Sequence, residues 1–323
     1  MRNFLFILTL LFATTLFARD QIKIVGSSTV YPFATTVAER FGKTSGFKTP
    51  VVESTGSGGG LKLFCAGLGT QHPDITNASR RIKQTEIDNC KKNGIKDITE
   101  VKIGYDGIAI ANSKKGVNFH LSTRDLYLAL AKDVPADIDG KTVKPNPYKK
   151  WIEINPTYPD LPIMVYGPPP TSGTRDALNE LGIERGCKTY PERKKLKEKN
   201  KELYKSECRA IRTDGAYIEA GENDNLIIEK LITNPDSLGI FGYSFLDENR
   251  DKVKAATING VSPEFELISN GTYPISRSLW FYVKDAHAVV IPGIREYTKE
   301  FTSDRAIGDD GYLIEKGLIP LND

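Results

Sequence analysis

Residues 25–33 read VGSSTVYPF, and this stretch decides the fold because an apolar run ends here and a helical pattern begins. Gly26 to Thr29 are all small, while apolar residues recur at helical spacing from Val30 to Phe41. A helix start of this kind leaves backbone N–H donors uncovered at the positive end of the helix dipole. Alone it predicts a helix cap and nothing more.

Two later turns repeat this pattern. STGSGGGLK at 54–62 follows the strand-like TPVVE, and TSGTRDAL at 171–178 follows PIMVYGPPP. Each lies where a strand ends and a helix begins, with hydroxyl side chains as additional donors. Three such turns predict, as a hypothesis about geometry, that their donors converge on one small oxyanion.

Other anion and nucleophile motifs fit less well. GSGGGLK lacks the Gly-Lys-Ser/Thr ending of a P-loop and does not match G-x-G-x-x-G. Ser57 lacks the first glycine of a nucleophile elbow, and the three histidines are scattered along the chain. These features disfavour a nucleotide-binding protein or an esterase with a serine triad.

Composition sets the class of protein. The 323 residues are 39% apolar and 26% charged, which predicts a globular chain with room for two domains. A formal net charge of +3 gives no overall field for nucleic acid or an anionic membrane. Strand-like segments such as QIKIVG, IKDITEVKIG, GIAIAN and LPIMVYG alternate with helical ones, which is typical of an α/β protein.

The first 18 residues, MRNFLFILTLLFATTLFA, predict a secretory signal peptide. One early cation, Arg2, precedes an apolar stretch, and small residues near Ala18 suggest cleavage after that position. A membrane anchor is the alternative, but the run is short for a span of ~20 apolar residues. We therefore expect an exported, soluble mature protein.

The four cysteines, Cys65, Cys90, Cys187 and Cys208, predict two disulfides in an exported chain. Three pairings are possible, and proximity in sequence favours Cys65 with Cys90 and Cys187 with Cys208. A zinc site is the alternative, but no C-x-x-C pair supports it, so no metal is expected. The charged segment ERKKLKEKNKELYK at 192–205 lies between the second pair and predicts a solvated helix, because acidic residues are mixed with the basic ones.

The turns also carry a family resemblance. GSSTVYPF, STGSGGGLKLF, DITNASRRI, IGYDGIAIAN and SGTRDAL resemble, in the same order, the periplasmic phosphate-binding proteins of ABC transporters, of the type II periplasmic binding protein family. The resemblance extends through IRTDGAYIEAGENDN, GIFGYSF and YPISRSLWFYVK. It implies an α/β clamshell with hinge strands and a ligand cleft between lobe I (19–104 and 261–323) and lobe II (105–260).

The resemblance also implies the function. The protein would be a monomeric, non-enzymatic carrier that binds inorganic phosphate, delivers it to an ABC transporter permease in the inner membrane, and needs no cofactor or nucleic acid. Another tetrahedral oxyanion (sulfate, molybdate or a phosphonate) and a secreted phosphoester hydrolase are the alternatives. The family's ligand positions fall on Ser28, Thr29, Val30, Ser57, Ser172, Gly173 and Thr174.

Two positions depart from the family pattern. Arg80 follows Ser79 where many members have an aspartate, and Pro168 stands where many have an arginine. The departures suggest that Arg80 clamps the anion beside Ser79, with Arg175 or Arg212 as a second charge. For Arg81 we expect a surface ion pair.

The missing aspartate leaves the selectivity for phosphate without its usual carboxylate. Phosphate near neutral pH keeps a proton that a carboxylate can accept, whereas sulfate has none. Asp106, in IGYDGIAI, is the first candidate for a replacement, with Asp214 and Glu222 behind it. For Asp214, in T-D-G, a turn cap is the more ordinary role.

Overall fold

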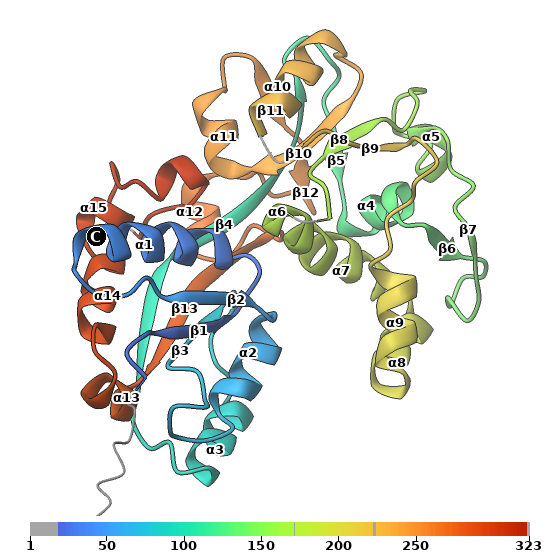
Figure 1. The fold of residues 1–323 in the computed structure, drawn as a ribbon. Coiled ribbons are helices and arrows are strands. Elements are labelled where there is room, and N and C mark those ends of the chain that lie inside the picture. The colour runs from blue at the N-terminus through green and yellow to red at the C-terminus, as the bar shows by residue number, and fades with distance from the viewer. Residues whose placement is uncertain (1–18, 171, 222–223, 322–323) are drawn as a thin grey trace, which may run out of the picture.

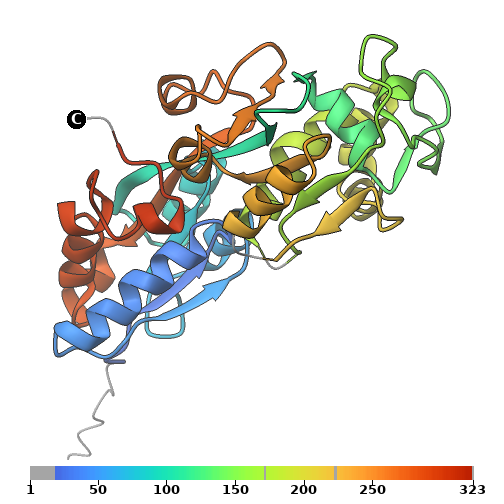
Figure 2. The same ribbon diagram turned by 90° about the horizontal axis from the view of Figure 1, so that it is seen from above.

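The structure is a computed structural model that describes residues 19–170, 172–221 and 224–321. The predicted signal peptide, residues 1–18, lies outside the described residues. The chain folds into two halves that lie side by side (Figure 1), and the view from above shows the helix that follows VGSSTV directed at the other half (Figure 2).

Within the described residues, nine strands form one sheet in the order β2-β1-β3-β13-β4-β10-β8-β9, with β11 also paired to β4. β1 is parallel to β2 and β3, whereas β13 is antiparallel to both β3 and β4. The strands are β1 (Lys23–Gly26), β2 (Val51–Ser54), β3 (Ile75–Ala78), β4 (Ile98–Ser113), β8 (Val165–Gly167), β9 (Tyr217–Glu219), β10 (Leu238–Gly242), β11 (Val253–Ala255) and β13 (Ser276–Lys284). Small two-stranded sheets pair β5 (His120–Leu121) with β12 (Thr257–Ile258) and β6 (Asp133–Pro135) with β7 (Val143–Pro145).

β4 joins the two halves. Its first part pairs with β13, and its residues Ile108–Ala111 pair with β10. The sequence predicts two strand segments here, IKDITEVKIG and GIAIAN, but they form one strand. Gly104 permits this continuity because its φ is +149° and a Cβ there would lie 2.4 Å from the Ile319 carbonyl oxygen.

Helices cover the sheet in both halves (Figure 1). In the first half they are α1 (Tyr31–Thr44), α2 (Ser57–Phe64), α3 (Gln84–Lys92), α13 (Asp285–Val290), α14 (Ile294–Phe301), α15 (Asp304–Ile307) and η2 (Ile314–Lys316). In the second half they are α4 (Thr123–Leu130), α5 (Trp151–Ile154), α6 (Gly173–Ala177), η1 (Leu178–Ile183), α7 (Glu184–Cys187), α8 (Pro191–Lys199), α9 (Lys201–Cys208), α10 (Asp224–Thr233), α11 (Tyr243–Glu248) and α12 (Phe265–Ser269).

The buried apolar residues form separate clusters in the two halves. Those from Ile22 to Ile103 and from Leu279 to Leu318 form the clusters of the first half. Those from Ile108 to Ile275, with Ile319, form the core of the second half. We propose lobe boundaries at these two divisions, with 104–107 and 276–278 as the linking segments. Residues 261–275 then move from the first lobe, where the sequence prediction placed them, to the second, because Ile268, Tyr273 and Ile275 pack in its core.

Both predicted disulfide pairings are confirmed. Cys65 bonds to Cys90, and Cys187 bonds to Cys208. The charged segment between the second pair forms two helices, α8 and α9, because Asn200 ends one and its side chain caps the other through the Leu203 N–H. The predicted single helix is therefore divided at this cap.

A buried carboxylate anchors these two helices. Glu184 of α7 is 1% exposed and lies 2.7 Å from Lys188 and 2.9 Å from Lys197, and it also pairs with Arg209. Three cations around one carboxylate offset the cost of burying it, so the α8–α9 pair is tied to the body of the second half. Across 19–170, 172–221 and 224–321, no helix is long and apolar enough to cross a membrane.

Candidate anion-binding site

The first and third glycine-containing turns meet across the two halves. A Cβ on Gly173 would lie 3.2 Å from the Thr29 Cα and 3.4 Å from the Ser28 carbonyl oxygen. The lack of a side chain at Gly173 therefore lets the start of α6 contact the turn before α1. Ser172 caps α6 by accepting the Thr174 N–H at 3.2 Å.

The second turn lies against the end of β3. Ser57, the first residue of α2, accepts the Ser79 N–H at 3.0 Å, and the two side-chain hydroxyls are 3.1 Å apart. Glycines make this packing possible, because a Cβ on Gly60 would lie 2.4 Å from the Cα of Gly26. Gly26 itself has φ +131°, a conformation that favours glycine. The first and second turns thus share one wall of the first half.

Arg277 lies between these groups. It is on β13 beside its cross-strand partner Asp106 of β4, with its Nε 3.2 Å from Asp106 Oδ2. Its Nη1 is 3.2 Å from Ser79 Oγ, and its Nη2 donates to Thr29 Oγ1. The side chain is only 7% exposed. A buried guanidinium that touches a hydroxyl of the first turn and the hydroxyl of Ser79, which contacts the second turn, supplies the positive charge that an oxyanion needs.

Arg277 also reaches the second half, where its Nη1 is 2.9 Å from Glu180 Oε2 on η1. The sequence analysis did not select Arg277, although it lies in YPISRSLWFYVK. The available signal is a charged residue two positions before the apolar run Leu279–Val283. Its pairing opposite Asp106 depends on the register between β13 and β4.

Arg80 does not join this group. Its guanidinium forms two hydrogen bonds with Glu86 of α3, at 2.9 and 2.7 Å. Glu86 also accepts the Lys83 N–H at the start of α3, so the pair belongs to the cap of that helix. The Arg80 guanidinium is therefore paired with Glu86 in this structure, and its expected clamp on the anion stays a prediction. Arg81 pairs with Glu100 at the surface, as expected.

Arg175 supports the third turn from behind. It is 8% exposed, donates to the Pro168 carbonyl oxygen at 3.0 Å, and lies 4.3 Å above the Tyr217 ring. These contacts hold the segment before α6, and the side chain is not among those that line the cavity described below. Arg175 therefore supports the third turn in this structure, and its direct contact with the anion stays a prediction.

Arg212 and Asp214 pair with each other away from the turns, at 2.7 and 2.5 Å. Arg212 also donates to the carbonyl oxygens of Ala129 and Tyr148. The hydrogen bond from Arg212 lowers the pKa of Asp214, so this carboxylate serves an ion pair of the second half. Glu222, the other reserve candidate, lies outside the described residues.

A cavity of about 520 Å³ lies at the contact between the halves, and three carboxyl side chains line it, those of Asp106, Asp224 and Glu315, together with the ammonium group of Lys316. Burial raises the pKa of Asp106 against the opposing effect of Arg277. Burial also raises the pKa of Asp224 to about 6, and the charge of Asp106 contributes to this increase. The hydrogen bond that Asp224 accepts from the Gly242 N–H, at 2.9 Å, lowers the pKa and offsets part of the increase. The lining residues are Ser28, Thr29, Tyr31, Pro32, Phe33, Asp106, Ser172, Gly173, Thr174, Asp224, Gly242, Phe245, Glu315, Lys316 and Gly317.

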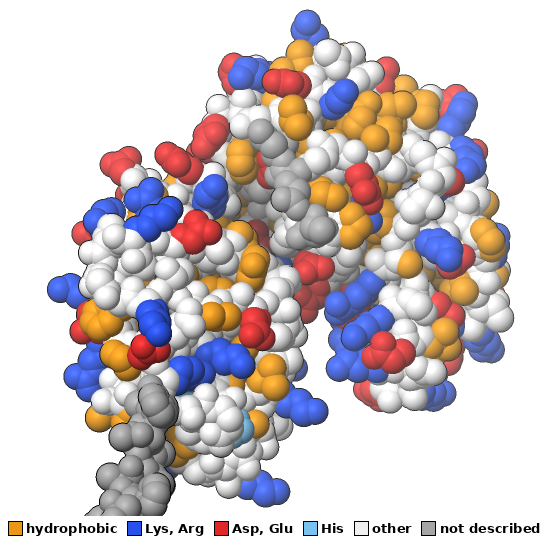
Figure 3. Space-filling view, viewed as in Figure 1, with side chains coloured by type: hydrophobic (Ala, Val, Ile, Leu, Met, Phe, Trp, Pro, Cys, Tyr) orange, Lys and Arg blue, Asp and Glu red, His pale blue; other side chains and the backbone are white. Residues whose placement is uncertain are grey.

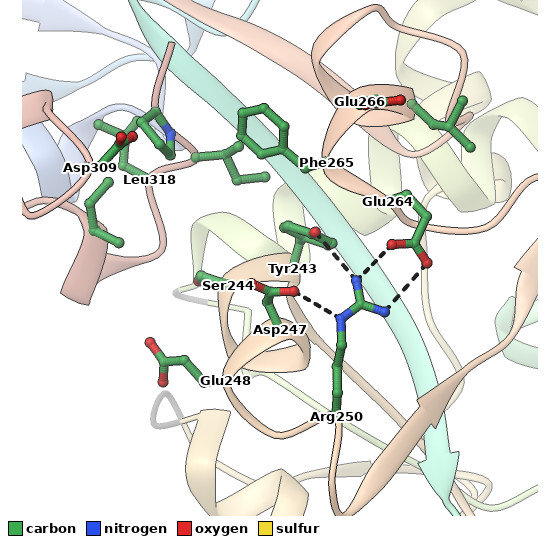
Figure 4. A pocket seen from close by; sticks show the side chains of 14 residues that line it. Tyr243, Ser244, Asp247, Glu248, Arg250, Glu264, Phe265, Glu266, Asp309 and Leu318 are labelled. Carbon is green, nitrogen blue, oxygen red and sulfur yellow. Dashed lines mark hydrogen bonds and ion pairs between the residues drawn. The ribbon is translucent and has the colours of Figure 1, made fainter. Parts of the chain in front are cut away.

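A larger cavity of about 910 Å³ is acidic and does not suit an anion. Figure 4 shows Arg250 in it, bound by Asp247 and Glu264 and close to the Tyr243 hydroxyl. Glu248, Glu266 and Asp309 also line the walls, and this excess of carboxylates repels negative ligands. The smaller cavity is the candidate anion site, because the guanidinium of Arg277 contacts two of its lining residues, Thr29 and Asp106.

The surface is hollowed between the two halves. Figure 3 shows Lys and Arg side chains gathered where the second half, near α7 and the α8–α9 pair, borders this gap. Positive charge at the mouth of a gap raises the local concentration of anions and their rate of association.

The fold and the site together define a class: a two-lobed α/β clamshell that brings helix starts from both lobes to a shared anion-binding cleft. The sequence profile of the PBP superfamily domain matches residues 13–305, and the chain belongs to this family. The predicted resemblance and the predicted fold class are thereby confirmed.

The chain is similar in sequence or structure to proteins from several organisms. Protein SphX of Synechococcus elongatus is 32% identical over 276 residues, which cover 84% of this chain and 70% of SphX. The phosphate-binding protein PstS of Staphylococcus saprophyticus is 28% identical over 88% of this chain and 76% of its own. A possible phosphate binding protein from Planctomyces limnophilus has a solved structure with a TM-score of 0.73 at 27% identity, covering 94% of this chain and 93% of its own.

Proposed function

We propose that this protein is a periplasmic solute-binding protein that captures inorganic phosphate between its lobes and delivers it to an ABC transporter permease. The observation that carries the proposal is the buried Arg277, which contacts hydroxyls of Thr29 and Ser79 close to the start of α6. The names of the relatives, phosphate-binding protein PstS among them, support phosphate as the solute.

In the proposed complex, the phosphate oxygens accept hydrogen bonds from both lobes. The first lobe provides Thr29, the backbone N–H of Val30 and the hydroxyls of Ser57 and Ser79. The second provides the Ser172–Thr174 turn, and Arg277 supplies the charge. Because Gly173 already contacts the Thr29 backbone, a small anion can bridge the lobes. Binding that links both lobes is a means by which a permease distinguishes the loaded from the empty protein.

Selectivity for phosphate is assigned to Asp106. It is 13% exposed and lines the same cavity as Thr29 and the α6 turn. A buried carboxylate can accept the proton that phosphate keeps near neutral pH and repels an anion without one. Asp224, on the same cavity, is a second acid that the sequence analysis did not select.

Isothermal titration calorimetry of the purified protein with phosphate, sulfate and molybdate tests this function. We expect heat of binding with phosphate and a weaker or absent signal with sulfate. Preference for sulfate would refute the phosphate assignment. Turnover of a phosphomonoester that is lost in Ser57→Ala would instead indicate a hydrolase, the alternative from another class.

A further inference from the structure

Glu180 is a charged group in the cleft that the proposed function does not use. Its carboxylate lies 2.9 Å from the Arg277 guanidinium and is carried by η1, so this ion pair spans the two halves. η1 is a π-helical turn between α6 and α7. Such turns are rare and occur often at functional sites.

Several cationic side chains act on Glu180. Besides Arg277, the guanidinium groups of Arg80 and Arg185 lie within electrostatic range of its carboxylate. Arg80 is held by Glu86, and Arg185 donates to the Pro274 carbonyl oxygen. Arg277 is therefore the cation that Glu180 contacts directly, and Arg80 and Arg185 add to the positive potential around it.

The two carboxylates that pair with Arg277 differ in how easily their ion pairs can break. Asp106 is 13% exposed and fixed opposite Arg277 by the pairing of β4 with β13. Glu180 is 49% exposed on a flexible side chain from the other half. Water can solvate Glu180 when it turns away, so breaking its ion pair costs little, whereas removing Asp106 would leave a buried charge without its partner.

We propose that Glu180 is an internal competitor of the anion: it occupies Arg277 while the cleft is empty and must be displaced when phosphate binds. This inference rests on the proposed function. It makes Glu180 a residue that weakens affinity, because the free energy of the Glu180–Arg277 pair is subtracted from that of phosphate binding. An anion with two negative charges can displace the single carboxylate, which favours phosphate over weakly bound monovalent anions.

The variant Glu180→Gln tests the inference because it keeps the shape and removes the charge. Glu202→Gln, on α9 of the same half, is the matched control, since it also removes one negative charge and its side chain is 84% exposed. Titration calorimetry with inorganic phosphate at one ionic strength gives the dissociation constant of each variant. From the usual strength of a partly exposed ion pair, we expect Glu180→Gln to bind phosphate about two- to fivefold more tightly. The control should match the unsubstituted protein.

The possible outcomes separate the two ideas. If the unsubstituted protein binds phosphate and Glu180→Gln binds it equally or more weakly, the competitor role is overturned and the proposed function stands. An equal gain in Glu202→Gln would also overturn it, because net charge would then explain the effect. If the unsubstituted protein binds no phosphate, the proposed function fails and the inference fails with it.

Discussion

Replacing Asp224 by Asn is expected to make the protein more stable at neutral pH. Asp224 is 6% exposed, and its carboxylate accepts the Gly242 N–H at 2.9 Å. Asparagine has the same shape and can accept that hydrogen bond through its side-chain oxygen. The substitution therefore removes a poorly solvated charge and keeps the packing.

The magnitude follows from the pKa of Asp224, which burial raises from its ordinary value of 3.8 to about 6. The folded protein then binds the proton more tightly than the unfolded chain does. Between these two pH values the unfolded chain ionises first, so the protein loses stability as the pH rises. Each pH unit between these two values lowers the free energy of unfolding by ~1.4 kcal/mol, so the total loss reaches up to ~3 kcal/mol above pH 6. Asp224→Asn should recover most of it at pH 7.

Urea unfolding followed by circular dichroism at several pH values from 4 to 8 measures this effect. The free energy of unfolding of Asp224→Asn should change less over pH 4–6 than that of the unsubstituted protein. Asp214→Asn is the control with the opposite sign, because the ion pair with Arg212 lowers the pKa of Asp214 and its loss should destabilise the protein. The reasoning is refuted if Asp224→Asn is less stable at pH 7 or keeps the original pH dependence.

Three further predictions concern the site and the second disulfide. Arg277→Met should weaken phosphate binding by ~100-fold or more in calorimetry, because hydrogen bonds from a buried guanidinium to an anion are worth ~1.5–3 kcal/mol each. Arg80→Met should weaken phosphate binding much less, and equal losses in the two variants would place Arg80 in the site as well. Asp106→Asn should reduce the ratio of phosphate to sulfate affinity, and an unchanged ratio would remove Asp106 from selectivity. The paired change Cys187→Ser with Cys208→Ser should lower the free energy of unfolding by ~3 kcal/mol, because the disulfide closes a loop with a sequence separation of 21; an unchanged urea midpoint would contradict this.

The turns of the site could be predicted because helix capping is local chemistry. Gly26–Thr29, Ser57 and Ser172–Thr174 each lie at or beside the start of a helix, and the residue types that cap helices also bind anions. The disulfide pairing was predictable for a similar reason, since short loops favour neighbours in sequence. These features need no knowledge of how distant segments pack.

Arg277 could not be found in this way. Its partner Asp106 is 171 residues away, and the contact depends on how β13 aligns with β4. Arg80 shows the converse, because Glu86 is only six residues away and forms a local ion pair that competes with a ligand. The boundary that the sequence suggests near residue 261 differs from the division we propose for the same reason, since the packing of Ile268 and Tyr273 is a tertiary contact.

The paired cysteines have a practical consequence. The sequence contains four cysteines and all four are in disulfides, so the native chain offers no reactive thiol. A cysteine introduced on an exposed position beside the gap would then be the single target for a maleimide dye. A dye sensitive to its surroundings would convert closure of the lobes into a fluorescence change, and the protein could serve as a reagentless sensor without removal of its own cysteines.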